Sequence, residues 1–441
     1  MSRLFDRFTP EPLESRTLLS ATWAFDGAPH PVGPLFTTVY TETNNPTSGQ
    51  NAVLAFRRNP FDGSLHQIGS FATGGTGQGN PTEMLGPDDS DQEVVATADK
   101  RFLLAVNQGS NTVTVFRIRL SGALHRVGTF DSGGVQPVSV GISGNKVYVV
   151  NRGNALGTTP GNAVPNISAF KLDRDGSLDL IPGATVSLPN GSTEAGLSPS
   201  QALVSPDGRL LFADLFGIPG TTPADGSTID PFQINPDGTL TQSPGGLQGA
   251  TGVTPPFLLG LASHPTLPIV YAGLVGANEV AVFTHSPDGS LKFITAVSDQ
   301  GKGVCWITVS SNGKYMYVAN TGSDSIGVYS LANPLAPRQI QEFKLAGPYA
   351  PPGLSAGTLQ ANAFQLALDP TNRSLYVITQ AQSQSFPGGN ALHELSVGPD
   401  GMLSENDGPI IFSQDDVPAT ARPQGVAVVG GFSVELIPDR R

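Results

Sequence analysis

Short apolar runs rich in β-branched and aromatic residues recur along this chain, and clusters of turn residues separate them. Residues 101–107 read RFLLAVN and residues 111–116 read NTVTVF; likewise, residues 315–320 read YMYVAN and residues 325–329 read SIGVY. Runs of this length between turn residues predict β-strands, because a helix needs a longer segment with a 3.6-residue period.

A turn signature, Gly followed two residues later by Leu, repeats in step with these strands. Asp precedes the Gly in most copies, and Asp-Gly favours a tight hairpin because Gly accepts a positive φ. The copies lie at residues 62–65, 121–124, 175–178, 237–240, 288–291 and 400–403. A degenerate seventh copy at residues 333–337 gives an average spacing of roughly 56 residues, near the ~50 of long propeller repeats.

Each unit contains four predicted strands. Two apolar runs precede the Gly-x-Leu turn, a further run lies upstream of them and ends in a second turn such as residues 205–208, and a short run such as residues 291–294 follows. Four antiparallel strands make one propeller blade. The sequence therefore predicts an all-β, seven-bladed β-propeller over residues 34–430, with a leader and lead-in at residues 1–33 and a tail at residues 431–441.

The two ends of the predicted ring complement each other. Residues 35–40, LFTTVY, match a second strand with no inner strand before it, and residues 422–429, RPQGVAVV, match an inner strand with no blade after it. We expect these segments to pair within one blade. Such pairing would close the ring and remove exposed sheet edges.

Composition excludes several classes of partner. The chain of 441 residues has a net charge of −12 and no Lys/Arg cluster, so we expect neither nucleic acid nor an anionic membrane surface as a partner. No apolar stretch approaches the ~20 residues of a spanning helix. The six histidines show no metal-ligand spacing, and we predict no metal, no cofactor and a monomer. The acidic stretch at residues 87–91 is interpreted as a solvated loop, and Cys305 as a buried, inert thiol.

The first twenty residues do not fit the strand pattern. Residues 8–21, FTPEPLESRTLLSA, lack the apolar core of an ordinary signal peptide. They are similar to the LEPR-x-LL signature found near the N-terminus of many exported bacterial surface proteins, with Ser15 in place of the Pro. That resemblance implies export to the cell envelope or the exterior, whereas a plain leader without a targeting role is the alternative.

The ring itself resembles a known family. Residues 205–215, SPDGRLLFADL, and the Asp-Gly-Ser-Leu turns resemble the seven-bladed lactonase family, which includes the propeller type of 6-phosphogluconolactonase and a muconate-lactonising enzyme. Residues 317–326, YVANTGSDSI, are similar to the YVTN surface-protein repeat. The resemblance covers residues 34–429 and implies a propeller that acts on a small lactone or carbohydrate.

The residues that the resemblance implies for catalysis are replaced in this chain. Where lactonase-type members typically carry Pro-His-Gln, this chain has Ser200 at the histidine position, and Leu259 and Gly260 stand where Arg-His is typical. An Asn-Glu pair typical of the family falls on Leu274 and Val275. The chain therefore lacks the family's catalytic His, Arg and Glu at these positions.

Superposing the units suggests a relocated site at the ends of the second strands, and it aligns Asp214 with Asn107. Lactone hydrolysis needs a base and a donor for the developing oxyanion, so Glu42 or Asp214 is a candidate base and Arg152 a candidate oxyanion partner. Short polar residues at strand ends also cap turns, which is the structural alternative. The candidate substrate-binding residues are Asn107, Asn151, Gln201, Asn320, Gln380 and Arg422.

Two functions remain open from the sequence. One is a lactonase-like hydrolase that acts on a sugar or organic-acid lactone in the cell envelope through an altered site. The other is a non-catalytic, exported propeller that serves as a surface binding or interaction module. The fold alone does not decide between them, because one fold hosts many functions.

Overall fold

A computed structural model describes the chain over residues 35–78, 90–153, 163–188, 197–217, 227–253, 257–347, 361–383, 385 and 387–433. The predicted leader with its export signature lies outside these residues. The described part consists of strands and two short 3₁₀ turns, η1 (Gln108–Ser110) and η2 (Pro387–Gly389). No helix within it is long and apolar enough to span a membrane.

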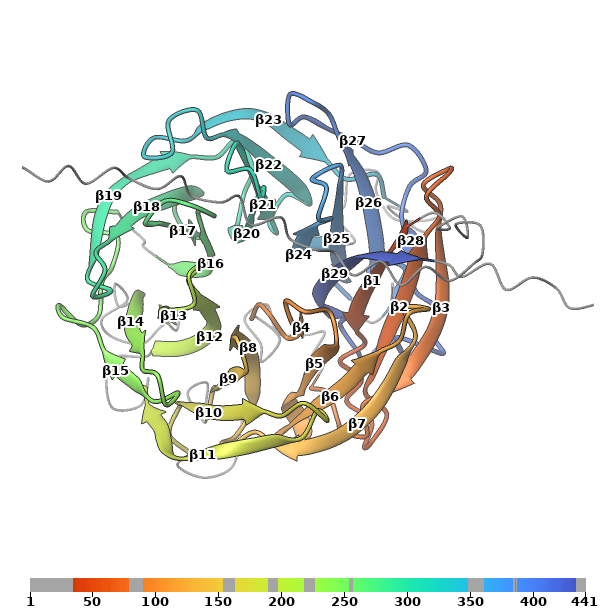
Figure 1. The fold of residues 1–441 in the computed structure, drawn as a ribbon. Coiled ribbons are helices and arrows are strands. Elements are labelled where there is room, and N and C mark those ends of the chain that lie inside the picture. The colour runs from red at the N-terminus through yellow and green to blue at the C-terminus, as the bar shows by residue number, and fades with distance from the viewer. Residues whose placement is uncertain are drawn as a thin grey trace, which may run out of the picture.

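Seven antiparallel sheets, here called blades A to G, form a ring (Figure 1). Inner strands of six blades line a cavity at its centre, which we call the central channel. Blade A contains β1 (Leu35–Glu42), β2 (Ala52–Arg58), β3 (Leu65–Ala72) and β29 (Gln424–Ser433). Blade B contains β4 (Val94–Ala96), β5 (Phe102–Asn107), β6 (Thr112–Ile118) and β7 (Leu124–Asp131). Blade C contains β8 (Pro137–Ser143), β9 (Lys146–Asn151), β10 (Asn166–Leu172) and β11 (Leu178–Ser187).

The other four blades repeat this order. Blade D contains β12 (Leu197–Val204), β13 (Leu210–Gly217), β14 (Thr228–Ile234) and β15 (Leu240–Gln242). Blade E contains β16 (Leu258–Ser263), β17 (Ile269–Leu274), β18 (Glu279–His285) and β19 (Leu291–Ser298). Blade F contains β20 (Val304–Val309), β21 (Tyr315–Asn320), β22 (Ser325–Ser330) and β23 (Arg338–Lys344). Blade G contains β24 (Ala361–Leu368), β25 (Ser374–Ala381), β26 (Ala391–Val397) and β27 (Leu403–Ser404), and β28 (Ile410–Ile411) pairs with β26.

The ring closes as the sequence predicts. The last strand, β29, becomes the inner strand of blade A and pairs antiparallel with β1, with Val39 opposite Val428. Both ends of the described chain therefore lie in one sheet, and the predicted fold class is confirmed.

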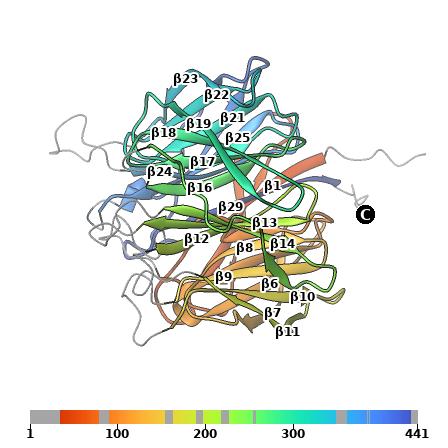
Figure 2. The same ribbon diagram turned by 90° about the vertical axis from the view of Figure 1, so that its left-hand side faces the viewer.

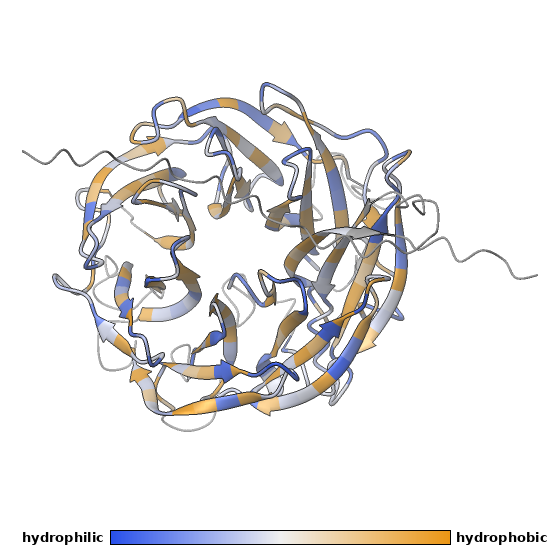
Figure 3. Ribbon diagram, viewed as in Figure 1, coloured by the Kyte–Doolittle hydropathy of each residue, from blue (hydrophilic) through white to orange (hydrophobic). Residues whose placement is uncertain are grey.

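The hydrophobic core lies between adjacent blades rather than in one central cluster. Side chains of β5 and β6 such as Leu104 and Val115 pack with Val140, Val149 and Phe170 of blade C. Apolar segments recur along the strands of every blade (Figure 3), and the side view shows the sheets stacked face to face (Figure 2). Each fully buried aliphatic or aromatic side chain contributes about 1.5–3 kcal/mol, so every interface between blades stabilises the ring.

Bulges near the start of the inner strands change the direction of the side chains at that end of each blade. In β12 the pairing with β13 shifts between Pro199 and Gln201, and similar shifts occur in β8, β16, β20 and β24 and at the start of β29. A bulge inserts an extra residue and re-aims the side chains beside it. These bulges lie where the inner strands begin and the second strands end, at the end of the channel that we call the upper rim. The opposite end, with the turns between inner and second strands, is the lower rim.

Candidate functional site

Arg152, Ser200 and Asp214 meet at the upper rim, at the boundary of blades C and D. The Oγ of Ser200 donates a hydrogen bond to Oδ2 of Asp214 at 2.7 Å, and the backbone N–H of Gly260 donates to the same oxygen at 2.8 Å. Nε of Arg152 donates to the carbonyl oxygen of Pro199 at 3.2 Å. Ser200, Asp214 and Arg152 are fully buried. The structure thus brings together two of the predicted catalytic residues, Arg152 and Asp214.

The carboxyl of Asp214 is placed to take up a proton near neutral pH. Burial raises its pKa to about 7, although the hydrogen bonds from Ser200 and Gly260 and the charge of Arg152 oppose that rise. The nearby carboxyl of Asp91 raises the pKa further. Oδ1 of Asp214 is buried and has no hydrogen-bond partner among the described residues. A carboxyl with a pKa near the working pH suits general acid–base chemistry.

Glu42, the other candidate base, belongs to a second cluster at the boundary of blades A and B. Its Oε1 accepts a hydrogen bond from Nδ2 of Asn51 at 2.7 Å, and the same amide group donates to Oδ1 of Asn107 at 3.0 Å. Burial raises the pKa of Glu42 well above its ordinary value, and hydrogen bonds with Asn51 and Gln424 lower it in part. Glu42 is therefore a buried carboxyl whose surroundings favour its neutral form.

The segment from Ser90 to Glu93, just before β4, joins the two clusters. Burial raises the pKa of Glu93 well above its ordinary value, and the carboxyls of Asp91 and Glu42 raise it further. Asp91 in turn raises the pKa of Asp214. Four carboxyls, those of Glu42, Glu93, Asp91 and Asp214, thus form an interacting series across the upper channel. Asp91 was expected in a solvated loop, and the sequence pattern gave no signal that this segment enters the ring.

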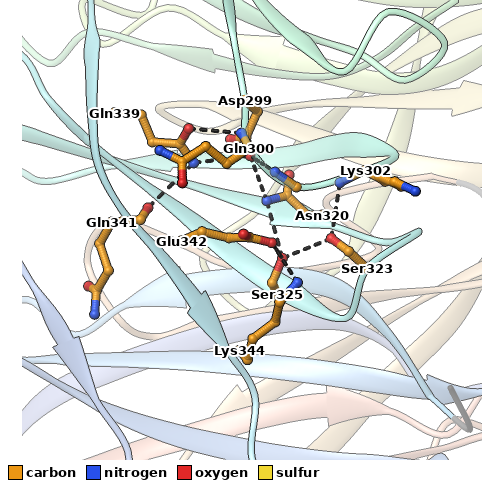
Figure 4. A network of polar contacts seen from close by, with 11 residues as sticks. Asp299, Gln300, Lys302, Asn320, Ser323, Ser325, Gln339, Gln341, Glu342 and Lys344 are labelled. Carbon is orange, nitrogen blue, oxygen red and sulfur yellow. Dashed lines mark hydrogen bonds and ion pairs between the residues drawn. The ribbon is translucent and has the colours of Figure 1, made fainter. Parts of the chain in front are cut away.

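Three predicted substrate-binding amides are engaged in hydrogen bonds with neighbouring strands and loops. Nδ2 of Asn107 donates to Oγ1 of Thr114 at 2.9 Å, and Nδ2 of Asn151 donates to Oδ1 of Asn166 at 3.0 Å. Nδ2 of Asn320 donates to Oδ1 of Asp299 at 2.9 Å in the polar network of blades E and F shown in Figure 4. These contacts tie the second strand to its neighbours in the way that the structural alternative describes.

The other three predicted binding residues lie near the inner strands. Gln201 exchanges two hydrogen bonds with the backbone of Leu261, which join blade D to blade E. Nε2 of Gln380 donates to the carbonyl oxygen of Pro423 at 3.0 Å, which joins blade G to blade A. Arg422 is buried just before β29. Gln201 and Gln380 therefore link neighbouring blades at the upper rim.

The strand register corrects the superposition of repeats. Asn107 pairs with the first residue of β6, whereas Asp214 pairs with the second residue of β14. Asp214 is therefore equivalent to Val106, and its predicted equivalence to Asn107 is wrong. Because side chains alternate between the two faces of a strand, this slip of one residue turns Asp214 to the opposite face from Asn107. Asp214 faces the inner strand of blade E, where Gly260 donates to it.

The upper channel has an apolar side as well as an acidic one. Leu259, at a position where the family resemblance implies a polar residue, packs in a buried cluster with Phe216, Trp306 and Phe364. The rings of Trp306 and Phe364 lie 5.4 Å apart at 73°, an edge-to-face contact. The guanidinium of Arg152 lies 5.5 Å from the centre of the Phe216 ring, so Arg152 stands where the acidic and apolar sides meet.

In the described ranges, no group of three or more His, Cys, Asp or Glu side chains is placed to hold a metal ion. Cys305 is buried in the apolar cluster with Trp306, as its inner-strand run predicts.

A family model described as "Lactonase, 7-bladed beta-propeller" matches residues 49–159 and 215–382, more than half of the chain. The chain belongs to the seven-bladed lactonase family. The matched residues include Arg152, whereas the second match begins immediately after Asp214. No curated protein sequence gives a significant match.

Solved structures of lactonase propellers share this fold. A putative 6-phosphogluconolactonase from Bacteroides fragilis has a TM-score of 0.63 at 17% identity, covering 92% of this chain and all of that one. The periplasmic gluconolactonase PpgL of Pseudomonas aeruginosa has a TM-score of 0.65 at 17% identity, covering 89% of this chain and 99% of that one. A hypothetical selenium-binding protein from Sulfolobus tokodaii scores 0.61 at 14% identity, covering 92% and 96% of the two chains. At these identities the likeness establishes the fold alone.

Proposed function

We propose that this propeller hydrolyses the cyclic ester of a sugar or organic acid at its upper rim, with Asp214 as the base and Arg152 as the oxyanion partner. The observation that carries the proposal is the placement of Asp214, whose buried carboxyl has a pKa of about 7 and lies within electrostatic reach of Arg152. Membership of the lactonase family supports the reaction type.

The proposed reaction needs no group beyond these side chains and water. The carboxylate of Asp214 takes a proton from a water molecule, whose oxygen attacks the lactone carbonyl carbon. The carbonyl oxygen becomes negative, and the positive charge of Arg152 stabilises it. The ester C–O bond then breaks, the ring oxygen receives the proton from Asp214, and the product is an open hydroxy acid. Ser200 positions the base, because its hydroxyl donates to Oδ2, whereas the buried Oδ1 accepts no hydrogen bond from the described residues.

A non-catalytic binding module is the second candidate, and the apolar side of the rim favours it. Leu259 and its partners Trp306 and Phe364 occupy the side where the family resemblance implies ionisable groups. Trp306 and Phe364 are themselves buried, so what favours this candidate is the loss of ionisable groups on this side of the rim. In this alternative the rim binds a carbohydrate without changing it.

Hydrolysis of δ-gluconolactone, its 6-phosphate and a muconolactone by the purified protein separates the two candidates. Asp214→Asn and Arg152→Ala are each expected to lower the rate at least about 100-fold. Asp230→Asn is the matched control, because Asp230 is also a buried carboxyl of blade D with a raised pKa, of about 6, but bonds to Gln242 at 2.8 Å instead.

Three outcomes are informative. Turnover no faster than spontaneous hydrolysis contradicts the enzymatic proposal, and calorimetric binding of the same compounds without turnover supports the binding module. Loss of turnover in Glu42→Gln with full activity in Asp214→Asn transfers the base to the second cluster. Loss of turnover in Asp214→Asn, with turnover retained in Asp230→Asn and Glu42→Gln, supports the site as proposed.

We also propose that the protein acts outside the cytoplasm. The support is the export signature near residues 13–19 and the periplasmic location that the Pseudomonas aeruginosa relative's name states for that protein. Fractionation of the native host, with detection of the protein in envelope and culture fractions, tests this; a purely cytoplasmic protein contradicts it.

A further inference from the structure

The segment from Ser90 to Glu93 lies across the central channel. Nε2 of Gln365, in blade G, donates to the carbonyl oxygen of Ser90 at 2.5 Å and to Oε1 of Glu93 at 2.8 Å. On the other side, the backbone N–H of Asp91 donates to the carbonyl oxygen of Ser200, in blade D, at 3.2 Å. This segment of blade B thus bridges two blades that are not its neighbours, and it separates the upper rim from the rest of the channel.

Below this segment the channel forms a cavity of about 580 Å³. Inner strands of blades A, B, D, E, F and G line it, and it opens at the lower rim beside turn residues such as Pro206 and Pro370. The volume falls within the roughly 300–1,000 Å³ of small-molecule sites. The cavity is distinct from the proposed lactonase site, because Ser200, Asp214 and Arg152 are not among its lining residues.

Much of the cavity wall is aliphatic, although Ser263, Thr308, Ser311, Asp369 and Asn372 also line it, and several of the aliphatic residues are partly exposed. Leu203, Val309, Leu368, Val426 and Val428 are all lining residues of this kind. Covering such surface with an apolar ligand is favourable at roughly 25 cal/mol per Å² removed from water. The walls therefore favour a ligand with an alkyl chain.

The inner end of the cavity is polar and rich in acceptors. Asp91, Gln92 and Gln201 form it. The amide of Gln201 is already engaged, since its Oε1 accepts from the N–H of Leu261 at 2.6 Å and its Nε2 donates to the carbonyl oxygen of Leu261 at 3.0 Å. The contacts of that Nε2 with Oδ2 of Asp91 and Oε1 of Gln92 are longer, 3.3 Å each. These two oxygens are thus available to a stronger donor.

Electrostatics at this end favour a cation. Asp91 interacts with the carboxyl of Glu93, which in turn interacts with Glu42, and Asp91 also interacts with Asp214. Arg152 faces this series through Asp214, whose pKa it lowers. Burial raises the pKa of Asp91 to about 7, so above that pH its carboxylate would form an ion pair with an arriving ammonium group.

We propose that the lower channel binds a small primary amine on an unbranched aliphatic chain, with its ammonium group on Asp91 and Gln92 and its chain along the aliphatic walls. A carboxylate head would meet acidic groups, and a neutral head would gain no ion pair. The proposal does not depend on lactone hydrolysis, because the two sites lie on opposite sides of the Ser90–Glu93 segment.

Calorimetric titration at pH 8 with hexylamine, hexanol and hexanoate tests the charge without changing the protein. Hexylamine is expected to bind with one site per chain and at least tenfold more tightly than the alcohol, and hexanoate is expected not to bind. Equal binding of all three, or no binding of the amine, overturns the proposal.

Two variants test the location. Asp91→Asn is expected to weaken hexylamine binding at least tenfold, and Ala367→Phe, which fills the cavity from the wall of β24, is expected to abolish it. Ala332→Phe is the matched control, since Ala332 is exposed in the turn between β22 and β23 and does not line the cavity. Unchanged binding in Ala367→Phe, with a circular dichroism spectrum like that of the unmodified protein, contradicts a site in the channel.

Discussion

The hydroxyl of Tyr271 donates a hydrogen bond to the carbonyl oxygen of Pro334, 2.9 Å away in the next blade. Tyr40 makes the equivalent contact with the carbonyl oxygen of Gly122 at 2.7 Å. In both cases a tyrosine of the second strand contacts the turn between the third and fourth strands of the following blade. The degenerate turn at residues 333–337 therefore occupies the same place as the Gly-x-Leu turns, although it lacks their sequence.

Removing this hydroxyl should weaken the contact between blades E and F. Tyr271→Phe is expected to lower the free energy of unfolding by about 1 kcal/mol, because the carbonyl oxygen of Pro334 loses its partner. Tyr317→Phe should lower the free energy of unfolding by a similar amount, since the Tyr317 hydroxyl donates to the carbonyl oxygen of Gly401 at 3.0 Å. Urea unfolding measures both. Tyr315→Phe is the control with a smaller expected change, because its bond to Pro399 is exposed and 3.3 Å long; equal stability of Tyr271→Phe and the unmodified protein would contradict the role.

Gly273 sets how closely blades E and F approach. A Cβ at this position would lie 2.4 Å from the carbonyl oxygen of Cys305 and 2.6 Å from that of Leu259, and both atoms belong to the backbone. Gly273→Ala is therefore expected to cost about 1–3 kcal/mol in unfolding free energy. Gly430→Ala is the comparison, since its nearest atom would be a side-chain carbon of Pro370 at 3.3 Å. A smaller loss for Gly273→Ala than for Gly430→Ala would refute the packing argument.

The buried carboxyls predict that stability falls between about pH 4 and pH 7. The folded state raises the pKa of Asp214 from 3.8 to about 7, and that of Asp91 likewise. Below pH 4 each group is protonated in both states and imposes no penalty. As the pH rises, the unfolded chain loses its protons first, so unfolding becomes more favourable until the folded carboxyls also ionise.

Asp214→Asn should remove part of this penalty. The variant is expected to be more stable than the unmodified protein at pH 8 and equally stable at pH 4, as measured by thermal unfolding. Asp62→Asn is the control, because hydrogen bonds from Ser64 lower the pKa of Asp62. The ionisation of Asp62 therefore changes the stability only below about pH 4. A difference between Asp214→Asn and the unmodified protein that is constant with pH would show that Asp214 ionises normally.

Local signals in the sequence were sufficient to predict the fold. Asp-Gly turns specify hairpins whatever surrounds them, and the truncated blades at the two ends specify the closure seen between Val39 and Val428. Family membership was likewise predicted from turn and strand motifs, because these repeat in every blade.

The site was harder to predict because it depends on register and on contacts between distant segments. The superposition matched polar residues at the ends of the second strands and so placed Asp214 one residue away from its true equivalent, Val106. The entry of Asp91 and Glu93 into the channel depends on partners such as Gln365, 272 residues from Glu93 in the sequence. No local pattern marks such a contact, and an acidic stretch ordinarily indicates a solvated loop.

The pH dependence of kcat/KM for δ-gluconolactone hydrolysis tests the central claim most directly. With Asp214 as the base, the enzymatic rate above the spontaneous rate should rise through an apparent pKa near 7, and Asp214→Asn should abolish that rise while Asp230→Asn retains it. An enzymatic rate that is zero at every pH, or a profile that Asp214→Asn leaves unchanged, would contradict the account.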